Sequence, residues 1–132
     1  MADLIPANFR DLFEKKAFAQ LGTIMKDGTP QVTPVWVDFD GNHIRINSAL
    51  GRVKDKNMRR NPNVAVTLQD PDNPYRYVSV RGVVEEITQD GADAHIDSLA
   101  KKYMGQDKYP FRKEGEVRVI YKIRPDRVSS MG

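Results

Sequence analysis

The sequence predicts a mainly β domain, built as a six-stranded antiparallel barrel that is closed or nearly closed and carries flanking helices. Segments in which apolar and polar residues alternate recur between turns rich in Gly, Asp and Pro, as expected of half-buried strands. The chain shows no strand–helix–strand alternation of the parallel kind. Six strands would leave two open edges unless the sheet closes on itself. With 132 residues, the chain is expected to form one domain over residues 1–132.

The first expected element is a helix over residues 6–17. Phe9, Leu12 and Phe13 recur there at the spacing of one helical face. A short apolar strand over residues 20–25 follows, and an Asp-Gly pair after it predicts a tight hairpin turn. The chain therefore enters its first hairpin within thirty residues of its start.

The run over residues 31–39 alternates and is expected to form one strand, with one face carrying Gln31, Thr33, Val35, Val37 and Phe39. Pro34 has no N–H to donate, so it indicates an edge, a bulge, or a place where something other than a strand lies alongside. A second turn leads into a strand over residues 43–48. Three strands joined by short turns predict an antiparallel meander.

Two further strands are expected over residues 63–69 and 75–87. Alternation supports both, because Val64, Val66 and Leu68 share one face of the first. Gly82 interrupts the second strand and predicts a bulge or a bend there.

The C-terminal third is expected to hold one helix and one strand. Thr88 or Asp90 can cap a helix that Gly105 is placed to end. Its apolar stripe at 3.6-residue spacing consists of Ala92, Ile96, Leu99, Ala100 and Tyr103. The last strand covers residues 117–124, and the tail from Pro125 is expected to be irregular.

Composition narrows the class of protein. The absence of Cys excludes disulfides, thiol chemistry and Cys-ligated metal sites. No apolar run approaches the ~20 residues that span a bilayer, and the opening Met-Ala-Asp-Leu-Ile-Pro does not resemble a signal peptide. We therefore expect a cytoplasmic protein with no membrane partner. His43 and His95 stand alone, without a second ligand at metal spacing, so no metal site is expected.

The segment after Gly51 holds five cations within nine residues, namely Arg52, Lys54, Lys56, Arg59 and Arg60. If Arg52 sits in a turn and a helix begins just beyond it, Arg52, Lys54 and the free N–H groups of the first helical turn converge on an anion such as a phosphate. The alternative is a solvated helix in which Asp55 and Arg59 form an i, i+4 ion pair. The spacing alone leaves both interpretations open.

Other residues give weaker indications. Trp36, the one Trp of the chain, either packs in the core or lies beside a bound ring. No Ser, Thr or carboxylate stands in a nucleophile or acid–base pattern, so no catalytic residue is nominated. A net charge of +3 also permits a basic barrel that binds single-stranded nucleic acid, with Trp36, Tyr75 and Tyr77 as stacking platforms. The cations and aromatics do not interleave along one strand face, apart from Tyr75-Arg76-Tyr77, so we expect no nucleic-acid partner.

Several motifs occur together, in order, over nearly the whole chain. They are Thr29-Pro30-Gln31-Val32, Trp36-Val37, Gly51-Arg52-Val53-Lys54, Asn57-Met58-Arg59, Asn61-Pro62-Asn63-Val64-Ala65, Asp72-Asn73-Pro74-Tyr75-Arg76-Tyr77, Ala92-Asp93-Ala94-His95-Ile96-Asp97, Lys108-Tyr109-Pro110 and Pro125-Asp126-Arg127-Val128. This ordered set resembles the pyridoxamine-5'-phosphate-oxidase-like split-barrel flavoproteins. It is most similar to the branch that uses a deazaflavin, the F420-dependent PPOX-class oxidoreductases.

The resemblance implies a split β-barrel that works as a homodimer and binds its cofactor at the dimer interface. It places the cofactor ring against Gln31, Thr33, Pro34, Val35 and Trp36. It places the phosphate-bearing tail against Ser48, Arg52, Lys54 and Asn57. The second subunit is expected to close the pocket with Tyr75, Tyr77 and the loop that begins at Lys108.

The resemblance also implies the chemistry. The expected cofactor is coenzyme F420, with FMN as the alternative. The expected reaction is hydride transfer from the reduced deazaflavin to an activated double bond of a small conjugated substrate. Lys56, Arg59 and Arg60 would meet the acidic oligoglutamate tail of the coenzyme, which FMN lacks. A carrier that binds the cofactor without turning anything over is a further alternative.

Overall fold

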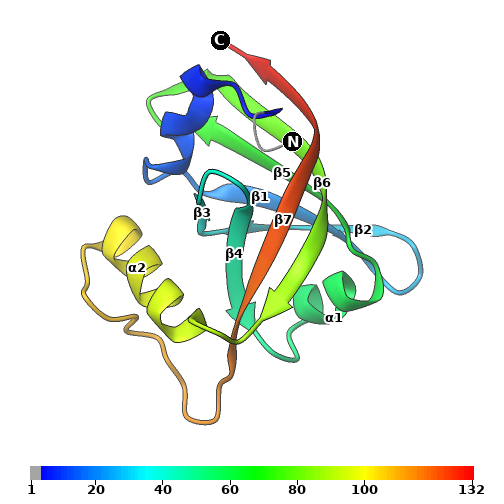
Figure 1. Cartoon of the computed structure of the whole chain (residues 1–132), viewed down its shortest axis with the longest axis vertical. Helices are drawn as coiled ribbons and strands as arrows, with labels where there is room; N and C mark the ends of the chain where they lie inside the picture. The colour runs from blue at the N-terminus through cyan, green and yellow to red at the C-terminus, as the bar shows by residue number, and fades with distance from the viewer. Residues whose placement is uncertain (1–3) are drawn as a thin grey trace.

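The computed structural model describes residues 4–132, so the first three residues of the opening segment that was read for a signal peptide lie outside it. One seven-stranded sheet dominates the fold (Figure 1). Its strands are β1 (Ala19–Ile24), β2 (Pro30–Val35), β3 (Val37–Phe39), β4 (Ile44–Ala49), β5 (Asn63–Asp70), β6 (Asn73–Thr88) and β7 (Arg118–Met131). The helical elements are a 3-10 helix η2 (Ala7–Phe13) and the α-helices α1 (Val53–Arg60) and α2 (Ala92–Met104). None of these helices is long and apolar enough to cross a membrane.

All strand pairs are antiparallel, and the sheet order is β2-β1-β5-β6-β7-β4-β3. The two edge strands, β2 and β3, are consecutive in the chain and separated by Trp36 alone. The sheet must therefore curl until its two edges approach each other, although they do not pair. This curled, incompletely closed sheet is a split barrel, which confirms the predicted mainly β fold.

The predicted strand over residues 31–39 is wrong in one respect, because it is two strands at opposite edges of the sheet. The count is therefore seven strands rather than six, and the first three expected strands do not form a meander. Val35 and Val37 are both buried, so alternation continues across the break and hides it. Pro30 and Pro34 confine β2 to an edge, because neither residue has an N–H for a further strand.

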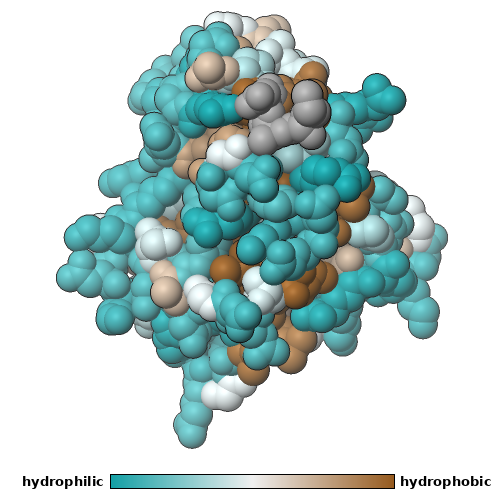
Figure 2. All heavy atoms as spheres, in the orientation of Figure 1, coloured by the Kyte–Doolittle hydropathy of each residue, from teal (hydrophilic) through white to brown (hydrophobic). Residues whose placement is uncertain are grey.

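Apolar side chains fill the inside of the curl. Every second residue is buried on β5 and over residues 78–84 of β6, and Val66, Leu68, Val78 and Val80 belong to one core cluster. The expected helix over residues 6–17 is shorter, a 3-10 helix, but its predicted apolar residues join this cluster. Figure 2 shows a largely hydrophilic face, with apolar side chains gathered in its lower half between α1 and α2.

The tail after Pro125 is not irregular, because β7 continues to Met131 along β6. Arg81 pairs with Arg127 and Gly82 pairs with Pro125, so Asp126 is the extra residue of a β-bulge. A Cβ on Gly82 would collide with the carbonyl oxygen of Arg124. Pro125 is tolerated because the bulge interrupts the ladder where its N–H is missing. The bulge predicted at Gly82 is confirmed.

Helix α2 follows Gly91 rather than a side-chain cap, because Gly91 is left-handed (φ 74°) and neither Thr88 nor Asp90 caps the first turn. Its predicted end at Gly105 is confirmed. Near that end, the Tyr103 hydroxyl accepts the Val37 N–H at 3.2 Å and donates to the Ala17 carbonyl at 2.7 Å. Helix α2 therefore contacts the open edge strand β3 at Val37, where the two edges of the barrel do not pair.

Candidate functional site

A hollow of about 220 Å³ lies where the end of β2, the start of α1 and the start of β7 meet. We call it the cationic hollow, and its lining residues are Phe18, Pro34, Val35, Trp36, Asn47, Arg52, Lys54, Ile96, Tyr109, Phe111 and Arg118. Five of these residues were predicted from the sequence to bind a cofactor: Pro34, Val35, Trp36, Arg52 and Lys54. Residues that are up to 100 positions apart in the sequence, Phe18 and Arg118, thus face one space.

The cationic segment enters the hollow through a glycine turn. Gly51 adopts φ +93°, a conformation that favours glycine, and Arg52 then has extended backbone as the residue before α1. This is the arrangement expected for an anion site, with Arg52 in the turn and Lys54 in the first helical turn. Both side chains line the hollow.

The buried carboxylate of Asp55 fixes the Gly51 turn through a hydrogen bond. This carboxylate, 2% exposed, accepts the Gly51 N–H at 2.9 Å, the Arg59 Nε–H at 2.9 Å and the hydroxyl proton of Tyr121. Burial alone would raise the pKa of Asp55, but these hydrogen bonds outweigh it and lower the pKa. The predicted Asp55–Arg59 ion pair therefore exists and supports the anion site rather than replacing it.

The hollow holds positive charge that its own residues compensate only in part. Burial, and then the charges of Arg52 and Arg118, lower the pKa of Lys54. Glu116 offsets part of this charge, because it accepts from Arg118 Nη1 at 2.9 Å and from Arg52 Nη2 at 3.4 Å. An anion in the hollow would stabilise the charged form of Lys54, so the site favours anions.

Sequence reasoning missed Arg118, which is 4% exposed. Its Nε–H donates to Asn47 Oδ1 at 2.9 Å, and its guanidinium lies 5.0 Å from the centre of the Tyr109 ring. Only the pairing of Ala49 with Arg118 brings it beside the Gly51 turn. No local pattern in the sequence could show this proximity, because the pairing joins residues almost seventy positions apart.

Aromatic rings line the cationic hollow beside the cations. Trp36 stacks on Tyr103, with ring centres 5.3 Å apart and an angle of 4° between planes. Tyr109 meets Trp36 edge-on at 6.0 Å and Phe111 at 5.8 Å. Phe18 and Phe111 are more than half exposed. A flat ring can pack against these side chains while an attached phosphate meets the cations.

Four other predicted residues lie outside the cationic hollow. Asn57 is 1% exposed, and its Nδ2 donates to Thr23 Oγ1 at 3.0 Å and to Gln31 Oε1 at 3.5 Å, beneath α1. Ser48 follows Ile44 and Ile46 on the core face of β4, and its buried Oγ has no partner among the described residues. Thr33 shares the inner face of β2 with Gln31.

The residues that were expected to close the pocket from a second subunit lie in two different places. Tyr75, 75% exposed, and Tyr77 lie at the start of β6, far along the sheet from the hollow. Lys108 is exposed and lies 3.7 Å from Asp97. The loop that begins at Lys108 instead sends Tyr109 and Phe111 into the hollow of its own chain.

The remaining cations of α1 point elsewhere. Arg59 is paired with Asp55, and Arg60 makes only long contacts, at 3.4 Å to Asn57 and 3.5 Å to the Ile24 carbonyl. Lys56 is exposed. None of these three cations lines the cationic hollow, so the structure divides the segment into two groups.

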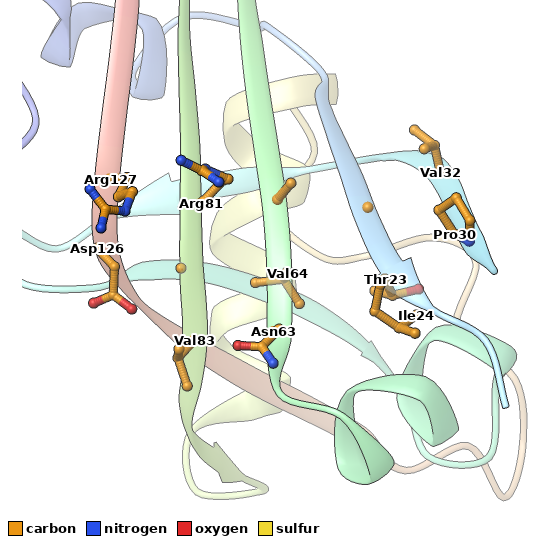
Figure 3. A pocket seen from close by; sticks show the side chains of 13 residues that line it. Thr23, Ile24, Pro30, Val32, Asn63, Val64, Arg81, Val83, Asp126 and Arg127 are labelled. Carbon is orange, nitrogen blue, oxygen red and sulfur yellow. The ribbon is translucent and has the colours of Figure 1, made fainter. Parts of the chain in front are cut away.

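A second, larger hollow of about 520 Å³ lies on the outer face of the sheet (Figure 3). We call it the outer hollow. Its floor is Gly22 and Ala65, which pair across β1 and β5, and Val32 borders it on β2. Arg81 and Arg127 border it on the other side, where they pair directly across β6 and β7. No described residue lies within ion-pair distance of either arginine.

The histidines form no metal site in the described part of the chain, where no cluster of three or more potential ligands occurs. His43 Nε2 contacts Glu85 at 2.7 Å, on the surface. His95 is buried between α2 and the sheet and contacts Asp38 at 3.1 Å. Both were expected to be structural or surface residues.

Comparisons with known proteins agree with this geometry. The family model of pyridoxamine 5'-phosphate oxidase matches residues 5–132. A solved structure called an F420 reductase shares 37% identity, with 95% of this chain and 98% of that chain covered and a TM-score of 0.83. A conserved hypothetical protein from Mycobacterium tuberculosis shares 26% identity over 99% and 88% of the two chains, with a TM-score of 0.76. A search of curated proteins gave no match.

The fold and these comparisons support a split-barrel protein of the flavin- or deazaflavin-type oxidoreductase class. The chain belongs to the pyridoxamine 5'-phosphate oxidase family. A putative member from Listeria innocua, 20% identical, shares the fold with a TM-score of 0.64 over 86% of each chain. The residues of the hollow fit such a cofactor, because aromatic surface and cations that are only partly neutralised lie side by side.

Proposed function

We propose that this protein is a reductase that uses reduced coenzyme F420 and binds it in the cationic hollow. The observation that carries the proposal is the convergence of Arg52, Lys54 and Arg118 beside Trp36. A phosphate diester linked to a flat ring needs this combination of charge and aromatic surface. The 37% identity to a protein called an F420 reductase supports the deazaflavin over other rings.

The chain would supply binding, orientation and exclusion of water. Arg52, Lys54 and Arg118 would hold the phosphate, and Trp36 and Tyr109 would hold the ring. When bound, the reduced deazaflavin would supply a hydride to an activated double bond of a small conjugated substrate, and water would supply the proton that completes the reduction. Tyr103 is not a free proton donor, because its hydroxyl already donates to the Ala17 carbonyl and burial raises its pKa to about 12.

FMN is the second candidate cofactor, because the family model is that of an oxidase with this fold. The deazaflavin coenzyme differs from FMN by its acidic tail. The exposed Lys56 on α1 is available to pair with that tail. Arg59 is less available than the sequence suggested, since Asp55 already binds it. The preference for F420 therefore depends on Lys56, Arg60 and the resemblance to the F420 reductase.

A turnover assay tests the reaction. The purified protein is mixed with reduced F420 and an α,β-unsaturated ketone, and the absorbance of the oxidised coenzyme is followed. We expect oxidation that depends on both the protein and the ketone. Reduced FMN in the same assay is the control. Oxidation no faster than in buffer, with every conjugated acceptor tested, would contradict a reductase and leave a cofactor carrier.

We also propose that the protein works as a homodimer that packs through the outer hollow. The cationic hollow, at about 220 Å³, is smaller than the ~300–1,000 Å³ of typical small-molecule sites, as expected of a site completed by a second copy. Val32 is 62% exposed on β2, and Pro34 of the same strand lines the cationic hollow. A partner seated on the outer hollow would therefore lie next to the cofactor.

Replacing Val32 by Asp is expected to convert the dimer to a monomer, because a carboxylate in an apolar contact loses its hydration. Light scattering after gel filtration gives the mass of each species. Val53→Asp is the matched control, since Val53 is also exposed and opens α1, where a carboxylate is tolerated. A dimer that survives Val32→Asp would exclude this interface, and a monomeric wild type would exclude the dimer.

A further inference from the structure

A chain of hydrogen bonds leads from Asp38 on β3 to Arg118 in the cationic hollow. Asp38 contacts His95 Nε2 at 3.1 Å, and His95 Nδ1 contacts Asn47 Nδ2 at 3.1 Å. Asn47 Oδ1 accepts from Arg118 Nε at 2.9 Å. We call these four residues the relay. All four lie outside the residues that sequence reasoning assigned to the site, and His95 and Asp38 do not line the hollow.

The partners of Asn47 fix the direction of its amide. Its Nδ2 also donates to the Ala92 carbonyl at 2.9 Å, and a carbonyl only accepts. Arg118 only donates, so the amide oxygen must face it. The nitrogen of Asn47 therefore faces His95 Nδ1, which must be an unprotonated acceptor.

The other end of the relay, at Asp38, also determines which ring nitrogen of His95 carries the proton. Arg45 holds Asp38 with two hydrogen bonds, of 2.8 and 2.9 Å. Burial alone would raise the pKa of Asp38, but its bonds with His95 and Arg45 outweigh burial and lower the pKa. An ionised carboxylate only accepts, so His95 Nε2 carries the proton and Nδ1 does not. Both ends of the relay thus require the same tautomer of His95.

We infer that His95 is a positioning residue for Arg118: through Asn47 it orients the guanidinium that the cationic hollow presents to an anion. The other neighbours of Arg118 agree, because Tyr109 covers one face of the guanidinium and Glu116 holds Nη1. Among residues 4–132, no hydrogen bond uses Arg118 Nη2. That nitrogen is left for a ligand. The inference rests on the proposed function only for the identity of the anion.

Two substitutions separate the two nitrogens of His95. In His95→Asn, an amide oxygen can occupy the place of Nδ1 and keep the acceptor for Asn47. In His95→Gln, the amide reaches the place of Nε2 and keeps the bond to Asp38, but leaves Asn47 without its acceptor. Both variants are polar and smaller than histidine, so a general loss of packing affects both.

The first readout needs no cofactor. The Arg118 Nε–H resonance in a proton–nitrogen NMR spectrum, identified by its absence in Arg118→Met, reports the bond to Asn47. We expect it to be protected from solvent exchange in wild type and His95→Asn, and lost in His95→Gln. Equal protection in both variants, or equal loss in both, would overturn the inference.

The second readout is F420 affinity. Removal of an outer partner of a metal ligand typically costs 10- to 100-fold. We take the lower value for this comparable support, so His95→Gln should weaken binding about tenfold and His95→Asn much less. In an Arg118→Met background, His95→Gln should have no further effect, because the two act through one group. Additive losses would overturn the inference. If wild type binds neither F420 nor FMN, the proposed function fails, while the NMR readout still decides the relay.

Discussion

Replacing Arg52 and Lys54 together by alanine is expected to weaken F420 binding by about 30- to 1,000-fold. A hydrogen bond to a charged group contributes ~1.5–3 kcal/mol, and the pair is expected to contribute ~2–4 kcal/mol in all. Each ~1.4 kcal/mol corresponds to a factor of ten in affinity. The effect should be large because both side chains line the hollow and only Glu116 partly neutralises them.

The matched control is Lys16→Ala with Lys26→Ala, which removes two exposed positive charges that lie outside the hollow and outside the cationic segment. Both double variants are titrated with F420 at one ionic strength, since screening weakens all such contacts. A small loss in the control and a large loss in Arg52→Ala with Lys54→Ala would support a phosphate site. Equal losses would mean that the segment is a solvated basic surface and not a phosphate site.

Replacing Asp55 by alanine is expected to lower the free energy of unfolding by about 3–5 kcal/mol. The change removes one buried carboxylate and leaves the Tyr121 hydroxyl, the Gly51 N–H and the Arg59 guanidinium without their acceptor. Urea denaturation measures the loss. Asp107→Ala is the control, because its pair with Lys101 is exposed on both sides and such pairs contribute ~0–1 kcal/mol.

The same variant has a pH signature. The folded pKa of Asp55 lies below its ordinary value, so its stabilisation is present above that value and is lost as the pH falls through the folded pKa. The difference between wild type and Asp55→Ala should therefore narrow on acidification. A difference that stays constant with pH would mean that Asp55 acts through packing rather than through its charge.

The sequence predicted most strands because burial alternates along them, and it predicted the bulge at Gly82 and the end of α2 at Gly105. It could not reveal the break at Trp36, since Val35 and Val37 are both buried and the pattern runs on through it. Nor could it place the C-terminal residues in β7. Pro125 indicates the end of a strand, unless a bulge at the next residue of the same strand makes room for it.

The residues of the candidate site also fall into two groups: those that local sequence features predict, and those that only strand pairing brings to the hollow. Arg52 and Lys54 were accessible from sequence because a glycine turn and a helix start are local features. Arg118 and Asn47 were not, because they reach the hollow only through the pairing of β4 with β7. Asn57 was assigned to the phosphate-bearing tail together with Arg52, yet it is buried beneath α1. A motif therefore identified the segment but not the direction of each of its side chains.

The most direct measurement of the central claim is a titration of the protein with oxidised F420 and with FMN, followed by tryptophan fluorescence. Trp36 is the sole tryptophan and lines the cationic hollow, so a ring bound there should quench it. Trp36→Phe provides the blank for nonspecific absorption. We predict saturable quenching by F420, with FMN requiring a much higher concentration. Equal quenching by FMN at the same concentration would contradict the deazaflavin assignment, and no saturable quenching by either would contradict the site itself.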